Sequence, residues 1–293
     1  MTTGKRTAFI GLGVMGYPMA GHLSQAGHEV VVFNRNSERS KAWASEYEGQ
    51  IAGTPGQAAE EADVVFVCVG NDDDVRSVVY GDDGIFAGLK PNSVLVDHTT
   101  ASSELAEELA DAATQQGCGF VDAPVSGGQA GAENGQLTVM CGGLENTFSA
   151  VAPVIEAYAK SVKLLGAVGA GQLTKMVNQI CIAGIVQGLS EALHFAKCAG
   201  LDGDAVVEVI SKGAAQSWQM ENRSTSMNAG EFEFGFAVDW MRKDLDITLR
   251  TARKLSAQLP MTALVDQFYA DVQNAGGGRW DTSSLITRLK SQD

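Results

Sequence analysis

The sequence is poor in the residues that build disulfide frameworks and metal centres. Among its 293 residues are four histidines and five cysteines, and no two cysteines have the Cys-x-x-Cys spacing. These features argue against a disulfide scaffold and against a zinc site. We therefore expect no bound metal, and free thiols in a cytoplasmic protein. The cysteines are Cys68, Cys118, Cys141, Cys181 and Cys198.

Positive charge is also scarce. The chain has 21 Lys and Arg residues against 35 Asp and Glu residues, which gives a net charge of −14. Because proteins bind nucleic acids largely through basic side chains, this balance argues against a nucleic-acid partner. The first residues, MTTGKRTAFIGLG, contain no cationic segment followed by a long apolar one. We therefore expect no secretion signal.

One long apolar stretch covers residues 170–199, and polar side chains interrupt it. A membrane-spanning helix needs about 20 predominantly apolar residues in succession. We therefore expect a core helix at this place and no association with a membrane. The interrupting residues are Gln179, Gln187, Glu191 and His194.

In the first half of the chain, short runs rich in Val, Ile and Phe alternate with helical patterns. The runs are apolar on both faces, which is typical of parallel strands buried between layers of helices. The pattern predicts an α/β Rossmann fold, a doubly wound parallel sheet. Strands are expected at 7–11, 29–33, 64–69, 93–97, 119–123 and 137–142, and helices at 15–25, 37–47, 73–80 and 102–116.

The pattern changes after a further strand-like run at 162–166. Only helical periodicity follows, with glycine or proline at the breaks. We therefore predict a Rossmann domain over residues 1–166 and an all-α C-terminal domain over residues 167–293. Helices are expected at 170–199, 203–212, 216–227, 238–257, 262–275 and 282–290.

A glycine-rich turn follows the first predicted strand and opens the first predicted helix. Gly11, Gly13 and Gly16 have the Gly-x-Gly-x-x-Gly spacing, and the strand–turn–helix context is the one in which that spacing indicates a dinucleotide site. The first glycine permits the tight turn, the second lets the backbone approach a pyrophosphate, and the third lets helix and strand pack closely. The helix N-terminus presents free N–H groups to the phosphates.

The second predicted strand ends in Asn34 and Arg35. A site for NAD usually has an acidic residue there, which accepts a hydrogen bond from the ribose. The nearest acid is Glu38, whereas an arginine can pair with the 2′-phosphate of NADP. We therefore favour NADP(H) over NAD(H), which stays possible; the alternative for Arg35 is an ordinary surface charge.

A second glycine-rich segment, DAPVSGGQAGAENG, covers residues 122–135. Ser126, Gly127 and Gly128 can present backbone N–H groups and a hydroxyl to a small anion such as a carboxylate. On spacing alone, a loop without a role is an equal alternative.

Lys175 lies at the start of the long apolar helix. Asn178 and Gln179 follow it by three and four residues, so the three side chains share one face of the helix. Burial disfavours the charged form of a lysine, which makes its ammonium a better proton donor near neutral pH. The alternative is a lysine that extends its ammonium into water.

Four segments in order resemble the β-hydroxyacid dehydrogenase family, which includes 3-hydroxyisobutyrate dehydrogenase, tartronate semialdehyde reductase and glyoxylate/succinic semialdehyde reductases. GLGVMGYPMAGHL resembles the cofactor fingerprint of the family and DAPVSGGQAGAENGQLTVMCGG its substrate-binding signature. GAGQLTKMVNQ resembles the catalytic segment, and RKDLDITL (242–249) the C-terminal cofactor segment.

The resemblance implies roles for single residues. Lys175 matches the catalytic lysine, and Ser126, Gly127 and Gly128 match the loop that binds the substrate carboxylate. Either Asn178 or Gln179 matches the substrate-side amide, and Trp218 is expected to wall the pocket unless it is a plain core residue. The implied cofactor-binding residues are Gly11, Leu12, Gly13, Val14, Met15, Gly16, Asn34, Arg35, Val69, Gly70, Thr100, Lys243 and Asp244.

Two of these positions need comment. Val69 and Gly70 stand where the family usually has Leu-Pro, so the contacts of that loop are open. Lys243 matches a lysine that reaches the cofactor, with Asp244 as its partner. His98 lies near the cofactor loop, and we expect a structural role for it.

The implied activity is an NADP-dependent interconversion of a small 3-hydroxy acid and its semialdehyde, with hydride transfer and with Lys175 as general acid and base. The implied partners are a small carboxylate substrate and further copies of the chain, in a dimer or tetramer. Glyoxylate, succinic semialdehyde, tartronate semialdehyde, methylmalonate semialdehyde and L-serine are all open as substrates.

Two other functions are compatible with the same fold. An imine reductase also uses NADPH, but such enzymes generally lack the lysine. A non-catalytic dinucleotide-sensing scaffold lacks the lysine as well and carries additional basic domains. The presence of Lys175 therefore favours the dehydrogenase.

Overall fold

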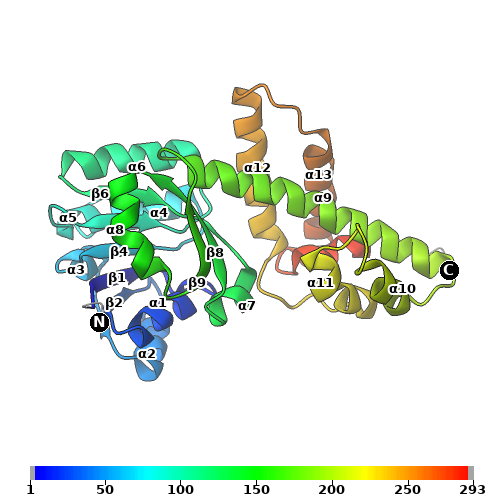
Figure 1. Ribbon diagram of the computed structural model, residues 1–293, viewed down its shortest axis with the longest axis horizontal. Coiled ribbons are helices and arrows are strands. Elements are labelled where there is room, and N and C mark those ends of the chain that lie inside the picture. The colour runs from blue at the N-terminus through cyan, green and yellow to red at the C-terminus, as the bar shows by residue number, and fades with distance from the viewer. Residues whose placement is uncertain (1–3, 290–293) are drawn as a thin grey trace. The chain divides into compact units, whose positions relative to one another are not determined.

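The computed structural model describes residues 4–289, which form two compact units (Figure 1). The first unit extends to Lys175, and the second begins at Met176. The first contains all the strands and eight helices, and the described part of the second is helical.

A nine-stranded sheet forms the centre of the first unit. Its first six strands are parallel in the order β3-β2-β1-β4-β5-β6, the usual order of dinucleotide-binding folds. β8 is antiparallel to β6 and β7, and β9 is parallel to β8. The strands are β1 (Arg6–Ile10), β2 (Glu29–Phe33), β3 (Gln50–Ile51), β4 (Val64–Val67), β5 (Val94–Asp97), β6 (Gly119–Asp122), β7 (Val125–Ser126), β8 (Leu137–Gly143) and β9 (Ala159–Leu164).

Helices cover both faces of this sheet. They are needed on both because successive side chains of a strand point to opposite faces, and apolar side chains lie on each face. On one face, Phe9 and Phe66 pack in a cluster with α1, α2 and α8. On the other face, Ile10 and Val65 pack in a cluster with α3, α4, α5 and α6. The helices are α1 (Gly16–Gln25), α2 (Ser37–Glu46), α3 (Pro55–Ala59), α4 (Asp72–Val79), α5 (Ile85–Gly88), α6 (Ser103–Gln115), α7 (Gly128–Glu133) and α8 (Glu145–Ile155).

Side-chain caps fix where several of these helices begin. Asn36, Thr54, Asn71 and Ser102 each accept a hydrogen bond from a backbone N–H in the first turn of the helix that follows. Such caps satisfy donors that have no partner within the helix.

The second unit is built around the C-terminal part of α9 (Ala170–Cys198). Ala183 and Val186 of α9 pack with α12 and α13, and Leu189 and Leu193 pack with α10 and α11. The other elements are α10 (Gly203–Ile210), α11 (Trp218–Ala229), α12 (Val238–Lys254), α13 (Pro260–Val272), a π-helical segment (Gln273–Gly277) and a 3-10 helix (Thr282–Arg288).

By length and composition, α9 could cross a membrane, and within residues 4–289 no other helix meets that test. A core helix passes the same test, and 44% of the most apolar window of α9 is buried inside the protein. Its packing on four other helices is that of a core helix.

The predicted fold class is confirmed. Every predicted strand and every predicted helix of the first half is present within a few residues of its expected bounds. The last predicted helix is a 3-10 helix, and residue 290 lies outside the described residues. Sequence reasoning missed β3 and β7, which have two residues each, and α3, α5, α7 and α8.

The predicted domain boundary between residues 166 and 167 stays a prediction. The compact units divide after Lys175, inside a continuous helix whose first turns belong to one unit and whose remainder belongs to the other.

Candidate active site

The turn after β1 has the backbone geometry that the glycine fingerprint requires. Gly11 has φ +98°, and a Cβ there would lie 2.2 Å from the carbonyl oxygen of Cys68. A Cβ at Gly16 would lie 1.9 Å from the carbonyl oxygen of Gly11. Both glycines are therefore needed by the fold itself, one for the turn and one for the packing of helix on strand.

Gly13 is different, because nothing in the protein requires it. It is exposed, and a Cβ there would meet no atom within 4 Å. A glycine with open space above it suits the close approach of a ligand to the backbone, which is the role of the second glycine in a dinucleotide site. The turn therefore fits a dinucleotide.

Asn34 holds this turn in place. Its Oδ1 accepts from the N–H of Leu12 at 2.9 Å, and its Nδ2 donates to the carbonyl of Asn36 at 3.0 Å. Arg39, which sequence reasoning missed, donates from Nη1 to the carbonyl of Leu12 at 2.7 Å. Val14 is exposed and Met15 is half-buried in the same turn.

Arg35 follows β2 and extends into solvent. Its side chain is 91% exposed, and its Nη1 lies 3.7 Å from Oδ1 of Asp74. An exposed ion pair at that distance contributes little, so the guanidinium can turn to a phosphate at small cost.

The predicted cofactor residues of the first unit follow the carboxyl ends of neighbouring parallel strands. Gly11 follows β1, Val69 and Gly70 follow β4, and Thr100 follows β5. Ligands of doubly wound folds bind outside these strand ends. The N–H of Val69 donates to Oγ1 of Thr99 at 3.1 Å, which links two of the loops.

The predicted carboxylate loop begins on β7, where Ser126 pairs with Thr138 of β8. Gly127 and Gly128 then have φ values of +135° and +61°, and both are exposed. A Cβ at Gly128 would meet no atom within 4 Å. The loop is thus anchored at one end and open at its two glycines.

Lys175 lies in the second turn of α9 and is 7% exposed. Asn178 and Gln179, also on α9, bond to each other, because Nδ2 of Asn178 donates to Oε1 of Gln179 at 2.8 Å. The Nε2 of Gln179 donates to Oδ2 of Asp244 on α12 at 2.6 Å. Both ends of the Gln179 amide are therefore engaged within the protein.

The predicted pair on α12 is present as an ion pair. Nζ of Lys243 lies 3.0 Å from Oδ1 of Asp244 and 5.9 Å from the ring centre of Trp240. Asp244 is 3% exposed; Lys243 balances its charge, and Gln179 donates a hydrogen bond to its other oxygen. Trp218 begins α11, is half exposed, and packs against the guanidinium of Arg223.

Buried titratable groups lie at the strand ends of the first unit. Burial raises the pKa of Asp97 to about 7, although hydrogen bonds from Thr99 lower it. Burial also lowers the pKa of His98 to about 4. Nδ1 of His98 lies 2.6 Å from the carbonyl of Ala123, which can only accept, so this nitrogen carries the proton. Nε2 then accepts from the hydroxyl of Tyr158 at 2.8 Å.

Sequence reasoning also missed Asp122 and Gln172. Both are buried, and they connect the end of β6, the start of α9 and the loop that contains Thr100. Each stands inside a segment already singled out, the glycine-rich 122–135 and the lysine-containing 169–179. Asp122 is the first residue of its segment and Gln172 the fourth of its own, and both are polar residues beside small or apolar neighbours.

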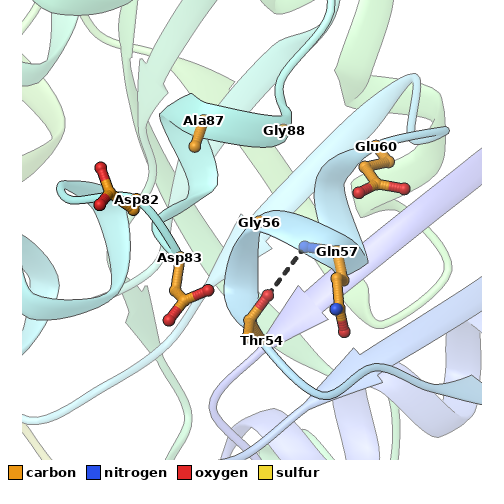
Figure 2. A pocket seen from close by; sticks show the side chains of 8 residues that line it. All are labelled: Thr54, Gly56, Gln57, Glu60, Asp82, Asp83, Ala87 and Gly88. Atoms are coloured by element: carbon orange, nitrogen blue, oxygen red, sulfur yellow. Dashed lines mark hydrogen bonds between the residues drawn. The ribbon is translucent and has the colours of Figure 1, made fainter.

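A small open hollow between α3 and α5 contains none of these residues (Figure 2). It is lined by Thr54, Gly56, Gln57, Glu60, Asp82, Asp83, Ala87 and Gly88. Within residues 4–289, no three His, Cys, Asp or Glu side chains gather in a way that would hold a metal ion. All five cysteines are free.

Two family models match consecutive parts of the chain and together cover residues 6–289. The NAD binding domain of 6-phosphogluconate dehydrogenase matches residues 6–168. The NAD-binding region of NADP-dependent 3-hydroxyisobutyrate dehydrogenase matches residues 169–289.

Relatives match over nearly the whole chain. An uncharacterized oxidoreductase of Shewanella frigidimarina is 61% identical over 97% of this chain and 98% of its own length. A protein of Arabidopsis thaliana, named probable 3-hydroxyisobutyrate dehydrogenase-like 1, mitochondrial, is 40% identical over 97% of this chain and 85% of its own length.

Solved structures have the same fold. The 3-hydroxyisobutyrate dehydrogenase of Mycobacterium tuberculosis, solved with L-serine, has a TM-score of 0.89 and 30% identity, and the match covers 98% of this chain and 100% of that one. An imine reductase from Pseudomonas sp. has a TM-score of 0.64 at 21% identity, which shows a shared fold alone.

Two glycine variants distinguish a glycine that is required for cofactor binding from one that is required for folding. Gly13→Ala should leave the melting temperature nearly unchanged and weaken cofactor binding by about tenfold or more, because its methyl group would enter ligand space. Gly16→Ala should destabilise the first unit by about 2 kcal/mol or more, because it forces a clash with backbone. Thermal melts and cofactor titrations test both; equal destabilisation by the two variants would contradict the assignment.

Asp97 should make stability depend on pH. Its pKa is about 7 in the folded chain and about 3.9 when unfolded, so between these values the folded state binds more protons. The free energy of unfolding should therefore fall as pH rises from about 4 to about 7, by on the order of 4 kcal/mol. Asp97→Asn, which keeps an acceptor for Thr99, should flatten this dependence in denaturant titrations. Equal slopes for the two proteins would be the contrary result.

Proposed function

Because the chain belongs to the β-hydroxyacid dehydrogenase family, we propose that this NAD(P)-dependent oxidoreductase is an NADPH-dependent reductase of small semialdehydes that carry a carboxylate. The product is the corresponding hydroxy acid, which is a 3-hydroxy acid for tartronate and methylmalonate semialdehydes, and the reverse reaction is its oxidation. L-serine, present in the related Mycobacterium tuberculosis structure, is itself a small 3-hydroxy acid.

The observation that carries this proposal is the position of Lys175. Its side chain is nearly buried, 7% exposed, in a compact unit that also holds the glycine turn at 11–16 and the glycine loop at 126–128. An ammonium kept out of bulk water is a suitable proton donor to a developing alkoxide. Together these features supply a place for a dinucleotide, a place for a carboxylate and a proton donor.

In the proposed reaction, Ser126, Gly127 and Gly128 bind the substrate carboxylate. The bound nicotinamide supplies the hydride for the carbonyl carbon. Lys175 donates a proton to the carbonyl oxygen as it becomes a hydroxyl, and in the oxidation direction it takes that proton back. Binding the carboxylate at a fixed place orients the carbonyl relative to the ammonium.

The structure favours Asn178 over Gln179 as the amide that contacts the substrate. The oxygen and nitrogen of the Gln179 amide are both bonded to protein groups, Asn178 and Asp244, and the residue is 1% exposed. Asn178 is only half-buried and lies one helical turn from Lys175. We propose that Gln179 holds Asn178 in place while Asn178 holds the substrate oxygen.

The cofactor residues are proposed as a set. The turn 11–16, which Asn34 holds in place, binds the pyrophosphate, and Arg35 holds the 2′-phosphate of NADP at the adenosine end. No acidic residue stands at the end of β2, and Asn34 uses its side chain within the protein. We assign Val69, Gly70, Thr100, Lys243 and Asp244 to the remaining contacts.

We further propose that the chain acts in the cytoplasm as a dimer or tetramer. α9 carries several exposed apolar side chains, among them Leu173, Val177 and Ile185. Burial of these side chains against a second copy would remove apolar surface from water.

Lys175→Ala tests the central role. With NADPH and a panel of succinic, tartronate and methylmalonate semialdehydes, kcat should fall by about a hundredfold or more, the usual scale of general acid catalysis. The Kd for NADPH should change little. Lys197→Ala, an exposed lysine of the same helix, is the matched control and should keep full activity.

The panel includes a cyclic imine as a competing substrate class. Turnover of the imine in preference to every semialdehyde would overturn the proposed function. Loss of NADPH binding in Lys175→Ala would show that the lysine has a structural role instead.

Arg35→Asp tests the cofactor preference. The ratio of kcat/KM for NADPH to that for NADH should fall by about tenfold or more, because a charge-assisted bond to phosphate is replaced by repulsion. Lys41→Asp, at an exposed position on α2, is a control for the change in net charge. An unchanged ratio in Arg35→Asp would mean that Arg35 is an ordinary surface residue.

A further inference from the structure

The carboxylate of Asp122 caps the start of α9. Asp122 ends β6 and is fully buried. Its Oδ1 accepts from the N–H of Gly169 at 2.8 Å, and its Oδ2 accepts from the N–H of Gln172 at 2.9 Å. The first N–H groups of a helix have no acceptor within it, and an anion there is favoured by the helix dipole. Both carboxylate oxygens are thus used on one helix end.

Two glycines, Gly142 and Gly171, leave room for this carboxylate. A Cβ at Gly142 would lie 2.5 Å from Oδ1 of Asp122. A Cβ at Gly171 would lie 2.8 Å from Oδ2 and 2.4 Å from the carbonyl oxygen of Met140. Two glycines therefore stand where any side chain would displace the carboxylate or the helix.

Gln172 extends the connection to the loop after β5. It is 1% exposed, and its Nε2 donates to the carbonyl of Thr99 at 2.8 Å. Its Oε1 accepts from the N–H of Ala101 at 3.0 Å. The amide thus binds the backbone on both sides of Thr100. Since one partner can only accept and the other can only donate, the orientation of the amide is fixed.

We propose that Asp122 and Gln172 are positioning residues, which set Lys175 and Thr100 in their places for the reaction. Gln172 precedes Lys175 by three residues, so a shift in the first turn of α9 moves the lysine with it. The proposal rests on the proposed function, in which Lys175 transfers the proton. Neither Asp122 nor Gln172 is assigned a contact with substrate or cofactor.

The burial of Asp122 supports a role beyond stability. Burial raises the pKa of its carboxyl to about 6, although the backbone N–H groups oppose this effect. Asp97, its register partner on β5, is a second acid beside it. Burial beside a second acid makes this carboxylate costly for the stability of the fold. Its two directed hydrogen bonds nevertheless fix the position of the first turn of α9.

Two variants test the two halves of this connection. Asp122→Asn has the same shape but turns an NH₂ towards one of the two N–H groups. It should lower kcat by about tenfold or more while leaving the Kd for NADPH within about twofold. Gln172→Met removes both bonds to the 99–101 loop, so it should lower kcat and also weaken NADPH binding. Ser93→Ala is the control, since it removes a buried hydrogen bond of 2.8 Å to Ala62 elsewhere in the same unit.

Amide hydrogen exchange provides a readout that does not depend on activity. In Asp122→Asn, exchange at 169–175 should be about tenfold faster than in the wild-type protein, and the strands should be unchanged. Equal kcat for Asp122→Asn and Ser93→Ala, or unchanged exchange at 169–175, would overturn the proposal. A wild-type protein inactive on every semialdehyde would instead refute the proposed function, and the exchange result would still decide whether Asp122 holds the helix.

Discussion

The hydrogen bonds between Asp122 and the first turn of α9 are the interaction on which, in our proposal, the position of Lys175 depends. They join a strand of the sheet to the helix that carries Lys175. Through Gln172 the same helix turn is joined to the loop that contains Thr100. A lysine is a long and flexible side chain, so its ammonium can be placed accurately only if the backbone beneath it is fixed. The two hydrogen bonds to the buried carboxylate of Asp122 fix the backbone at the start of this helix.

Glycine serves three physical purposes in this chain, and the structure distinguishes them. Gly11 and Gly16 allow the turn and the packing of α1 on β1, and Gly142 and Gly171 make room for a carboxylate. Gly13 and Gly128 have open space where a side chain would be. Gly13 points to a ligand, because neither its backbone conformation nor any atom of the protein excludes a larger residue there, whereas the positive φ of Gly128 itself favours glycine. The two positions lie in the segments assigned to the cofactor and to the substrate carboxylate.

Much of the fold was predictable because short runs that are apolar on both faces alternate with helical patterns along the first half of the chain. The glycine turn was predictable because both the Gly-x-Gly-x-x-Gly spacing and the strand before it can be recognised within one short segment of the sequence. α8 was missed; it contains Pro153 and follows a glycine pair. The pairing of Asp122 with Gln172 joins residues 50 positions apart, and no local pattern predicts it. Helical spacing likewise placed Asn178 and Gln179 on one face, but the bond from Gln179 to Asp244 on another helix could not be predicted from that spacing.

The most direct measurement is a crystal structure of the protein with NADP⁺ and L-serine or another small 3-hydroxy acid. We predict that Nζ of Lys175 lies within hydrogen-bond reach, about 3 Å, of the substrate hydroxyl oxygen. The substrate carboxylate should lie on the backbone of 126–128, and Asn178 rather than Gln179 should contact the hydroxyl. A complex in which the ammonium of Lys175 points away from the substrate, or in which the carboxylate binds elsewhere, would contradict the account.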